Sequence, residues 1–170
     1  MVEMEQFAVP MLVGLLVSLL SNPAWPAYAE IPPGPSKAGN GEVATHIARG
    51  IALAEKGDLD GAISEYRRAL SVDPNPSGAH NGLGNILARK GDFDGAISEF
   101  HAALNLSPNV AVVHNALGSA LWAKDDLDGA ISEFRQAISR SPHLAIAHDN
   151  LERALLAKRG ASGSGGRTEP

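Results

Sequence analysis

The sequence predicts an all-α protein made of stacked helix pairs, and three observations carry this prediction. A nine-residue block, 92–100, recurs with few changes at 58–66 and at 126–134. The three copies therefore follow a constant period of 34 residues. Within each period, apolar residues recur at three- and four-residue steps, which is the spacing of one helix face. A fixed period of roughly 20–50 residues is typical of solenoids, in which each unit buries its apolar face against its neighbours.

The central unit, residues 77–110, shows why each period should contain two helices. Gly91 suits the left-handed backbone position just past the end of a first helix. Asp92 and Asp94 follow it, where carboxylates cap free amides and meet the positive end of a second helix. Pro108 then ends that helix, because proline cannot continue it. The apolar stripes of the two helices are Ala79, Leu83, Ile86 and Leu87 in the first, and Phe93, Ala96, Ile97, Phe100, Ala103 and Leu104 in the second.

The spacing of Leu83-Gly84, Ala96, Phe100 and Pro108 resembles the pattern of the tetratricopeptide repeat. The units 43–76 and 111–144 carry matching residues, except that Arg49 replaces the leucine in the first of them. In all three units histidine and leucine stand where the family pattern has tryptophan and tyrosine. The resemblance covers residues 43–158. It implies a right-handed helix-turn-helix solenoid of three 34-residue units.

Residues 145–158 repeat the first helix of a unit without the second. His148, Leu151 and Leu155 stand at the expected places, but Glu152 replaces the glycine of the earlier units. A charge is tolerated there when no second helix packs against it. We therefore predict a C-terminal capping helix, since the last unit of a solenoid must present a polar outer face.

The N-terminal residues 1–29 resemble a secretory signal peptide. Residues 7–20 form an apolar run, and the segment closes with Ala27-Tyr28-Ala29, which predicts cleavage before Glu30. Glu3 and Glu5 disagree with this reading, because export signals normally begin with positive charge. The prediction is an exported protein, periplasmic or secreted. The alternatives are an uncleaved membrane anchor at residues 7–20, which is short for a span of about 20 residues, and a buried cytosolic helix.

Two segments flank the repeats and are predicted to lack regular structure. Residues 30–42 are rich in proline and glycine, which is typical of a linker. Residues 159–170 are rich in glycine and serine and are predicted to be a disordered tail.

Composition and motifs argue against several functions. The formal net charge is -5 and basic residues do not cluster, so nucleic acid is not an expected partner. The chain has no cysteine, which excludes disulfides, thiolate metal sites and cysteine nucleophiles. It has no nucleophile elbow, phosphate-binding loop or zinc-protease motif. We expect no enzyme activity, no catalytic residues and no cofactor.

Four histidines recur at the 34-residue period: His46, His80, His114 and His148. Packing between helices, a pH-sensitive seam and metal binding are the three interpretations. Packing is favoured, because neighbouring helices lie about 8–10 Å apart whereas zinc needs nitrogens at about 2.0–2.1 Å. No metal site is expected. The Asp-x-Asp-Gly segments are likewise assigned to helix capping, since they lack the later ligands of a calcium loop.

The resemblance implies a non-catalytic interaction module, because in this family the first helices line a concave groove that binds peptide segments. The residues it places on the groove are Asn81, Asn85, Arg89, Asn115, Ser119, Trp122, Asp149 and Arg153. Asn amides both donate and accept hydrogen bonds, and Trp122 offers a large contact surface. Ile47 and Ile51 argue against a basic clamp for C-terminal carboxylates. The expected partner is a protein or peptide, with membrane contact only if the N-terminal segment is uncleaved. The alternative is a structural protein that assembles into homo-oligomers.

Overall fold

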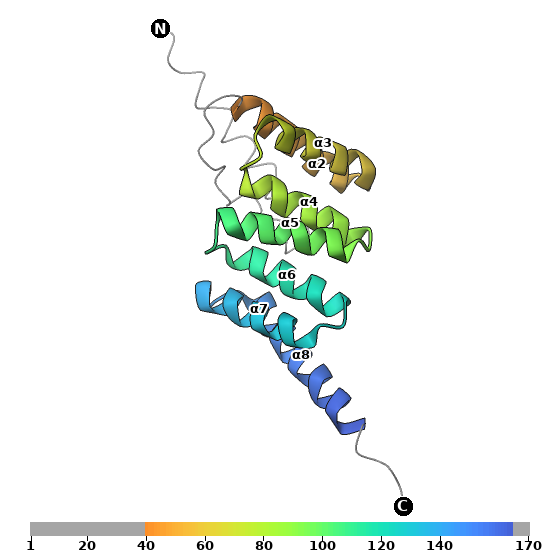
Figure 1. The fold of residues 1–170 in the computed structure, drawn as a ribbon, viewed down its shortest axis with the longest axis vertical. Helices are drawn as coiled ribbons and strands as arrows, with labels where there is room; N and C mark the ends of the chain where they lie inside the picture. Colours follow the sequence, from red (N-terminus) through yellow and green to blue (C-terminus); the bar gives the residue numbers. More distant parts are fainter. Residues whose placement is uncertain (1–39, 165–170) are drawn as a thin grey trace, which may run out of the picture. The chain divides into compact units, whose positions relative to one another are not determined.

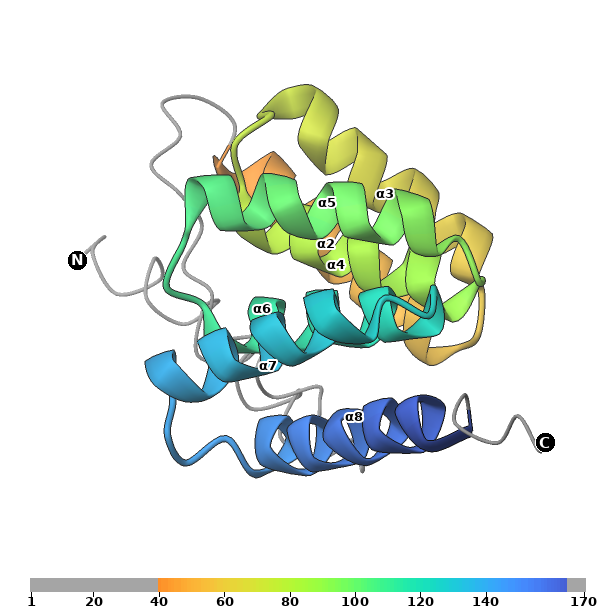
Figure 2. The same cartoon turned by 60° about the horizontal axis from the view of Figure 1, so that its bottom comes forward.

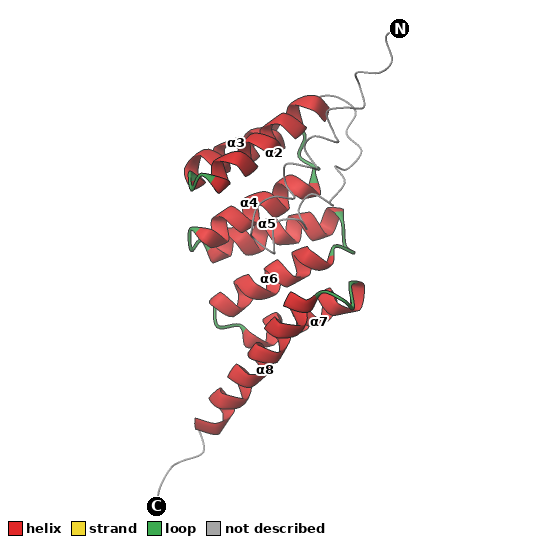
Figure 3. Ribbon diagram, turned by 180° about the vertical axis from the view of Figure 1, so that it is seen from behind, coloured by secondary structure: helices red, strands yellow, loops and turns green. Residues whose placement is uncertain are grey.

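The computed structural model describes residues 40–164, which form seven α-helices joined by short turns, with no strand in that range (Figure 1, Figure 3). The predicted signal segment, most of the predicted linker and residues 165–170 lie outside the described residues. The helices are α2 (Asn40–Glu55), α3 (Leu59–Val72), α4 (Ser77–Arg89), α5 (Phe93–Leu106), α6 (Ala111–Ala123), α7 (Leu127–Arg140) and α8 (Ala145–Ser164). The three helix pairs and the single last helix follow the order that the 34-residue period predicts.

Two helix boundaries differ from the prediction. The first helix begins at Asn40, inside the predicted linker, and α8 continues to Ser164 rather than ending at Lys158. No proline interrupts either extension. Once a helix is formed, each added residue contributes a further backbone hydrogen bond, so glycines near its end do not stop it.

The turns inside the helix pairs confirm the predicted caps. Asp92 accepts a hydrogen bond from the backbone amide of Gly95 at 2.9 Å, and Asp58 and Asp126 do the same in their units. Gly91 has φ +84°, the left-handed conformation that glycine adopts without a steric penalty. In the third pair Asp125 takes that place with φ 65°, which aspartate tolerates better than most residues.

The two helices of a pair approach each other closely at one glycine. A Cβ added to Gly84 in α4 would lie 2.8 Å from the ring of Phe100 in α5 and 3.2 Å from the carbonyl oxygen of Ala96. Gly118 stands in the same relation to Phe134 in the third pair. Phe100 and Phe134 are at most 1% exposed. The repeated glycine is therefore required because the aromatic ring of the second helix occupies the space of its side chain.

Successive pairs stack so that each second helix also contacts the next first helix, α3 with α4, α5 with α6 and α7 with α8. Figure 2 shows α5 lying across α4, α7 across α6, and α8 as the last layer. The first helices also contact one another directly, α2 with α4, α4 with α6 and α6 with α8. Because of these contacts, α2, α4, α6 and α8 lie side by side in one row although they are far apart in sequence.

Among the helices at residues 40–164, none is long and apolar enough to cross a membrane.

Candidate functional site

We use the name first-helix face for the surface of α2, α4, α6 and α8 that carries the two rows of residues given below, together with Arg89 and Trp122. Its members repeat at the 34-residue period, so the chain places one residue from each unit in a row. One row is Ile47, Asn81, Asn115 and Asp149, and the next is Ile51, Asn85, Ser119 and Arg153. The rows differ from unit to unit, whereas the second helices keep their repeated block. The first-helix face therefore differs chemically between units, whereas the block at the start of each second helix does not.

On α4, Arg89 is exposed and its guanidinium donates a hydrogen bond of 3.2 Å to the carbonyl oxygen of Ala54, at the end of α2. Asn85 is partly exposed, and its amide nitrogen donates to the backbone oxygen of Asn81 at 2.7 Å. The carbonyl oxygen of the Asn85 side chain has no partner among the described residues and remains able to accept a hydrogen bond.

Asn81 does not lie open to a ligand as the sequence predicts. It is only 1% exposed, and its amide nitrogen has no hydrogen-bond partner within residues 40–164. Its side-chain oxygen accepts a bond of 3.2 Å from Asn85. The reason is its position, since α4 is flanked by first helices on both sides, and neighbouring side chains cover this place.

On α6 and α8, Trp122 is the largest partly exposed side chain of the first-helix face. Its ring meets Phe134 edge-to-face at 6.4 Å, and the guanidinium of Arg153 lies 5.4 Å from its ring centre. Stacking of this kind contributes about 0.5–1 kcal/mol at exposed sites. Trp122 is thus held in a fixed position, which lowers the entropy cost of binding through it.

Three further predicted residues lie on the same two helices. Ser119 and Asp149 are exposed, and the Ser119 hydroxyl donates only within its own helix, to the backbone oxygen of Asn115. Asn115 is partly exposed, and its side-chain oxygen accepts a hydrogen bond of 3.0 Å from Asn150 of α8. Asn150, which was not among the predicted site residues, joins α8 to α6 at this point.

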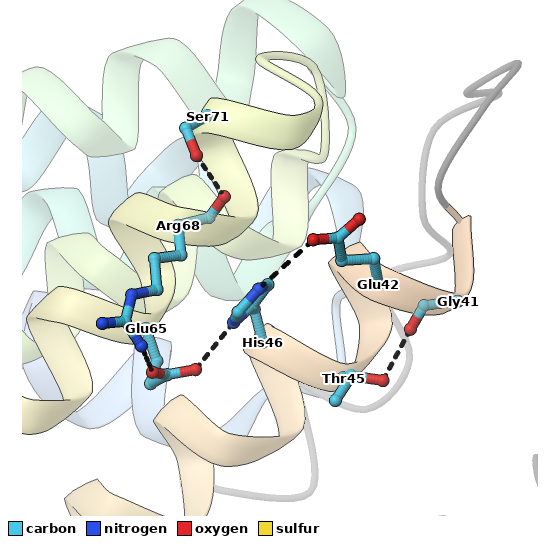
Figure 4. Close-up of polar contacts among 7 residues, drawn as sticks. All are labelled: Gly41, Glu42, Thr45, His46, Glu65, Arg68 and Ser71. Carbon is cyan, nitrogen blue, oxygen red and sulfur yellow. Dashed lines mark hydrogen bonds and ion pairs between the residues drawn. The ribbon is translucent and has the colours of Figure 1, made fainter.

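His46, His80 and His114 each lie between the two helices of their pair, whereas His148 is exposed on α8, where its Nε2 lies 2.8 Å from the carbonyl oxygen of Pro142. In each of the first three units the histidine Nδ1 lies 2.7 Å from a carboxylate oxygen of the second helix: His46 with Glu65, His80 with Glu99 and His114 with Glu133. Figure 4 shows the first of these pairs, in which Arg68 also bonds Glu65 from the other side. The hydrogen bond from His46, reinforced by Arg68 and opposed by burial, lowers the pKa of the Glu65 carboxyl.

His80 is held by acceptors on both ring nitrogens. Its Nε2 lies 3.1 Å from the carbonyl oxygen of Pro74, which can only accept, while Nδ1 faces the Glu99 carboxylate. Both nitrogens must carry a proton to satisfy these partners, so the site favours the imidazolium. The hydrogen bond to Glu99 accordingly raises the pKa of His80, against the opposing effect of burial.

This arrangement predicts that the protein loses stability as the pH rises above the pKa of an ordinary histidine. Because the folded-state pKa is raised, the contribution of His80 is complete below about pH 6.5 and is lost as the pH rises through the folded-state value. We expect the free energy of unfolding to fall by on the order of 1 kcal/mol between about pH 6 and 9. Urea unfolding at a series of pH values measures it. Glu99→Gln should flatten the curve, whereas Glu152→Gln, an exposed control on α8, should not; parallel curves for all three proteins would contradict the account.

A second set of ion pairs joins consecutive units along an exposed edge. Lys90 binds Asp60, Lys124 binds Asp94 and Lys158 binds Asp128. Asp94 therefore does more than complement the start of α5, as the sequence analysis expected, because it also reaches the end of the next first helix. Exposed pairs of this kind contribute about 0–1 kcal/mol each. They fix the register between units more than they stabilise the fold.

Within residues 40–164, no three histidine or acidic side chains lie close enough together to hold a metal ion. His46, His80 and His114 instead each bond one glutamate of their second helix, and His46 also lies 3.9 Å from Glu42. The sequence contains a signal for this arrangement, since each of the first three histidines is followed 19 residues later by a glutamate of the repeated block.

Comparison with known proteins places the fold in a recognised group. The model of the tetratricopeptide repeat family matches residues 47–111 and 92–145, which together span more than half of the chain. Sequence comparison finds no match among curated proteins.

Three solved structures are similar to this chain. The first tetratricopeptide domain of Spaghetti (RPAP3) bound to the HSP90 peptide SRMEEVD has a TM-score of 0.69 at 19% identity, over 70% of this chain and 94% of that one. The corresponding domain of human RPAP3 gives 0.69 at 20% identity, over 72% and 96%. MamA gives 0.66 at 22% identity, over 68% of each chain. At these identities the similarity concerns the fold.

Proposed function

Because this chain belongs to the tetratricopeptide repeat family, whose members are generally non-catalytic interaction modules, we propose that it binds an extended peptide segment of a partner protein along its first-helix face. The observation that carries the proposal is the contrast between the two kinds of helix. The second helices repeat one block that is used for packing, capping and ion pairs. The first helices form a continuous face whose side chains differ from unit to unit, which is what recognition of one particular sequence requires.

The chemistry of the first-helix face suits a peptide. The side-chain oxygen of Asn85 and the hydroxyl of Ser119 can bond a peptide backbone, and Trp122 supplies a positioned aromatic surface of the kind that dominates binding energies. Asn115 and Arg89 are tied to neighbouring helices and keep the face in one shape. The similar RPAP3 domain that holds an HSP90 peptide supports this mode of binding.

The proposed location is the cell envelope. This part of the proposal rests on the resemblance of residues 1–29 to a signal peptide and on the absence of cysteine. Sequencing the N-terminus of the protein recovered from its cell would test it. A start at Glu30 is expected, and an intact Met1 in the soluble fraction would contradict export.

A matched pair of serine variants tests the binding face. Ser119 on α6 and Ser132 on α7 are both exposed and belong to the same unit, but only Ser119 lies on the first-helix face. A partner peptide is first identified by capture on the wild-type protein and then titrated against purified variants. Ser119→Arg should weaken its binding by about 30-fold or more, because the long side chain covers the face, a loss of about 2 kcal/mol.

The test of the binding face also needs a control, Ser132→Arg, and a second variant of the face, Trp122→Ala. Ser132→Arg should bind as the wild type does, and Trp122→Ala should weaken binding about as much as Ser119→Arg. Since Trp122 also contacts Phe134, the melting temperature of that variant is measured beside its affinity. Equal affinity of the Ser119→Arg and Ser132→Arg proteins would overturn the proposed binding face.

A further inference from the structure

Helix α8 has an exposed stripe that its own chain leaves uncovered. Ile146 is 40% exposed and Leu156 58%, and Asp149 and Arg153 lie between them in the same exposed row. The steps of three, four and three residues keep all four on one helix face. The side chain of Asp149 makes no ion pair or hydrogen bond within residues 40–164.

The opposite side of α8 is the one that packs on the protein. Ala147 and Ala154 are fully buried, and Leu151 and Leu155 pack against the cluster that contains Ile131 and Phe134 of α7. The exposed stripe is therefore separate from the capping role of α8, and capping does not explain its apolar ends.

The stripe is complementary to itself when a second copy runs in the opposite direction. Ile146 and Leu156 lie at equal distances on either side of Leu151, and so do Asp149 and Arg153. In an antiparallel pair of α8 helices centred at Leu151, Ile146 faces Leu156 of the second copy and Asp149 faces its Arg153. A two-fold axis then makes each of these contacts twice, as an isologous interface requires.

We propose that two copies of this chain associate through antiparallel pairing of their α8 helices. Two apolar contacts lie at the ends of the seam and two ion pairs lie at its centre. Arg153 can keep its position over Trp122 while its guanidinium edge meets the carboxylate of the second copy. A single pair of helices buries a small interface, so the dimer belongs to the weak class. Asp149 and Arg153 also belong to the first-helix face, so the pairing covers the α8 end of that face; it is tested without peptide and does not depend on the proposed peptide binding.

Charge reversal tests the seam with the full-length chain. Light scattering from about 1 to 300 µM, the range where weak dimers form, should show the mass of the wild type rising from monomer toward dimer. Asp149→Arg and Arg153→Asp should each stay monomeric, because like charges then face each other twice. The double variant Asp149→Arg/Arg153→Asp should recover dimerisation, since the exchange restores both pairs.

A control on another exposed leucine distinguishes pairing through α8 from non-specific hydrophobic association. Leu106 on α5 is 40% exposed, as Ile146 is, so Leu106→Gln should dimerise like the wild type whereas Ile146→Gln should not. A wild type that stays monomeric throughout, or single charge variants that dimerise as it does, would overturn the proposal.

Crosslinking tests the direction, because the chain has no cysteine of its own. Ile146→Cys and Leu156→Cys chains, each alone, should give little disulfide-linked dimer, since like positions are about 15 Å apart along an antiparallel seam. A mixture of the two chains should crosslink under mild oxidation. Efficient crosslinking of each chain alone, with none gained on mixing, would contradict the antiparallel arrangement.

Discussion

A chain that ends at Leu144 is expected to be less stable than the full-length protein by about 3–6 kcal/mol. The lost helix α8 covers a cluster formed by Ala130, Ile131 and Phe134, with Ala154, Leu151 and Leu155 as its contribution. Burying a large apolar side chain contributes about 1.5–3 kcal/mol, and the removal leaves the last helix pair without an outer layer. Thermal unfolding followed by circular dichroism at low concentration measures the loss.

A shorter deletion provides the control. Ending the chain after Gly160 keeps Ala154 and every other residue that is buried between Ala145 and Gly160, and should change the free energy of unfolding by less than about 0.5 kcal/mol. If the Leu144 truncation melted at the same temperature as the full chain, α8 would not be a capping helix.

Phe100→Ala is expected to cost about 3–5 kcal/mol. Phe100 is 1% exposed and its ring fills the place that a side chain at Gly84 would take, between α4 and α5 of the central pair. Neither neighbouring helix can close over the space without shifting the stack, so a cavity remains. Urea denaturation gives the free energy, and the slope with urea shows whether unfolding stays cooperative.

Leu106→Ala serves as the comparison, since Leu106 lies in the same helix but is 40% exposed. Its cost should stay below about 1 kcal/mol. Similar losses for the two variants would mean that the aromatic ring of the repeated block does not hold the helix pair together.

The helices and their order were predictable because the same sequence pattern recurs in three units. Three copies of Asp-x-Asp-Gly, spaced by the same period, mark the start of each second helix. As that pattern predicts, Asp92 caps α5 by accepting a hydrogen bond from the backbone amide of Gly95. Glu152 in place of the repeat glycine predicted a helix without a partner, and it is exposed on α8.

The side-chain contacts between units were less accessible to sequence reasoning. The pairing of His80 with Glu99 and of Lys90 with Asp60 depends on how far one helix turns relative to the next, which a repeat period does not specify. Asn81 was expected to be open to a ligand on the first-helix face and is buried. Its burial depends on how closely neighbouring first helices approach, which the repeat period does not specify either.

The first pair shows how a local difference is accommodated. Tyr66 stands where the later units have phenylalanine, and its ring lies over both Gly50 and Gly82. A Cβ at Gly82 would come within 2.4 Å of that ring. The corresponding residues of the other first helices, Ala48, Ala116 and Asn150, have side chains. The glycine at 82 therefore accompanies the tyrosine at 66, a link that only the structure shows.

The near identity of the nine-residue block now has a fuller explanation. Its first aspartate caps the second helix, its second aspartate binds the lysine of the next unit, its glutamate holds the histidine of its own unit, and its aromatic ring fills the space beside the glycine. The block is thus occupied by contacts within the stack. Binding of a partner is left to the first helices, where the units differ.

The most direct test of this account is to follow backbone amide resonances by nuclear magnetic resonance while the captured partner peptide is added. The account predicts shifts at Asn85, Asn115 and Ser119 on the first-helix face, with Ser98 and Ser132 on the second helices unchanged. Shifts confined to Ser98, Ser132 and their neighbours would show that the partner binds the opposite side, and the central claim would be wrong.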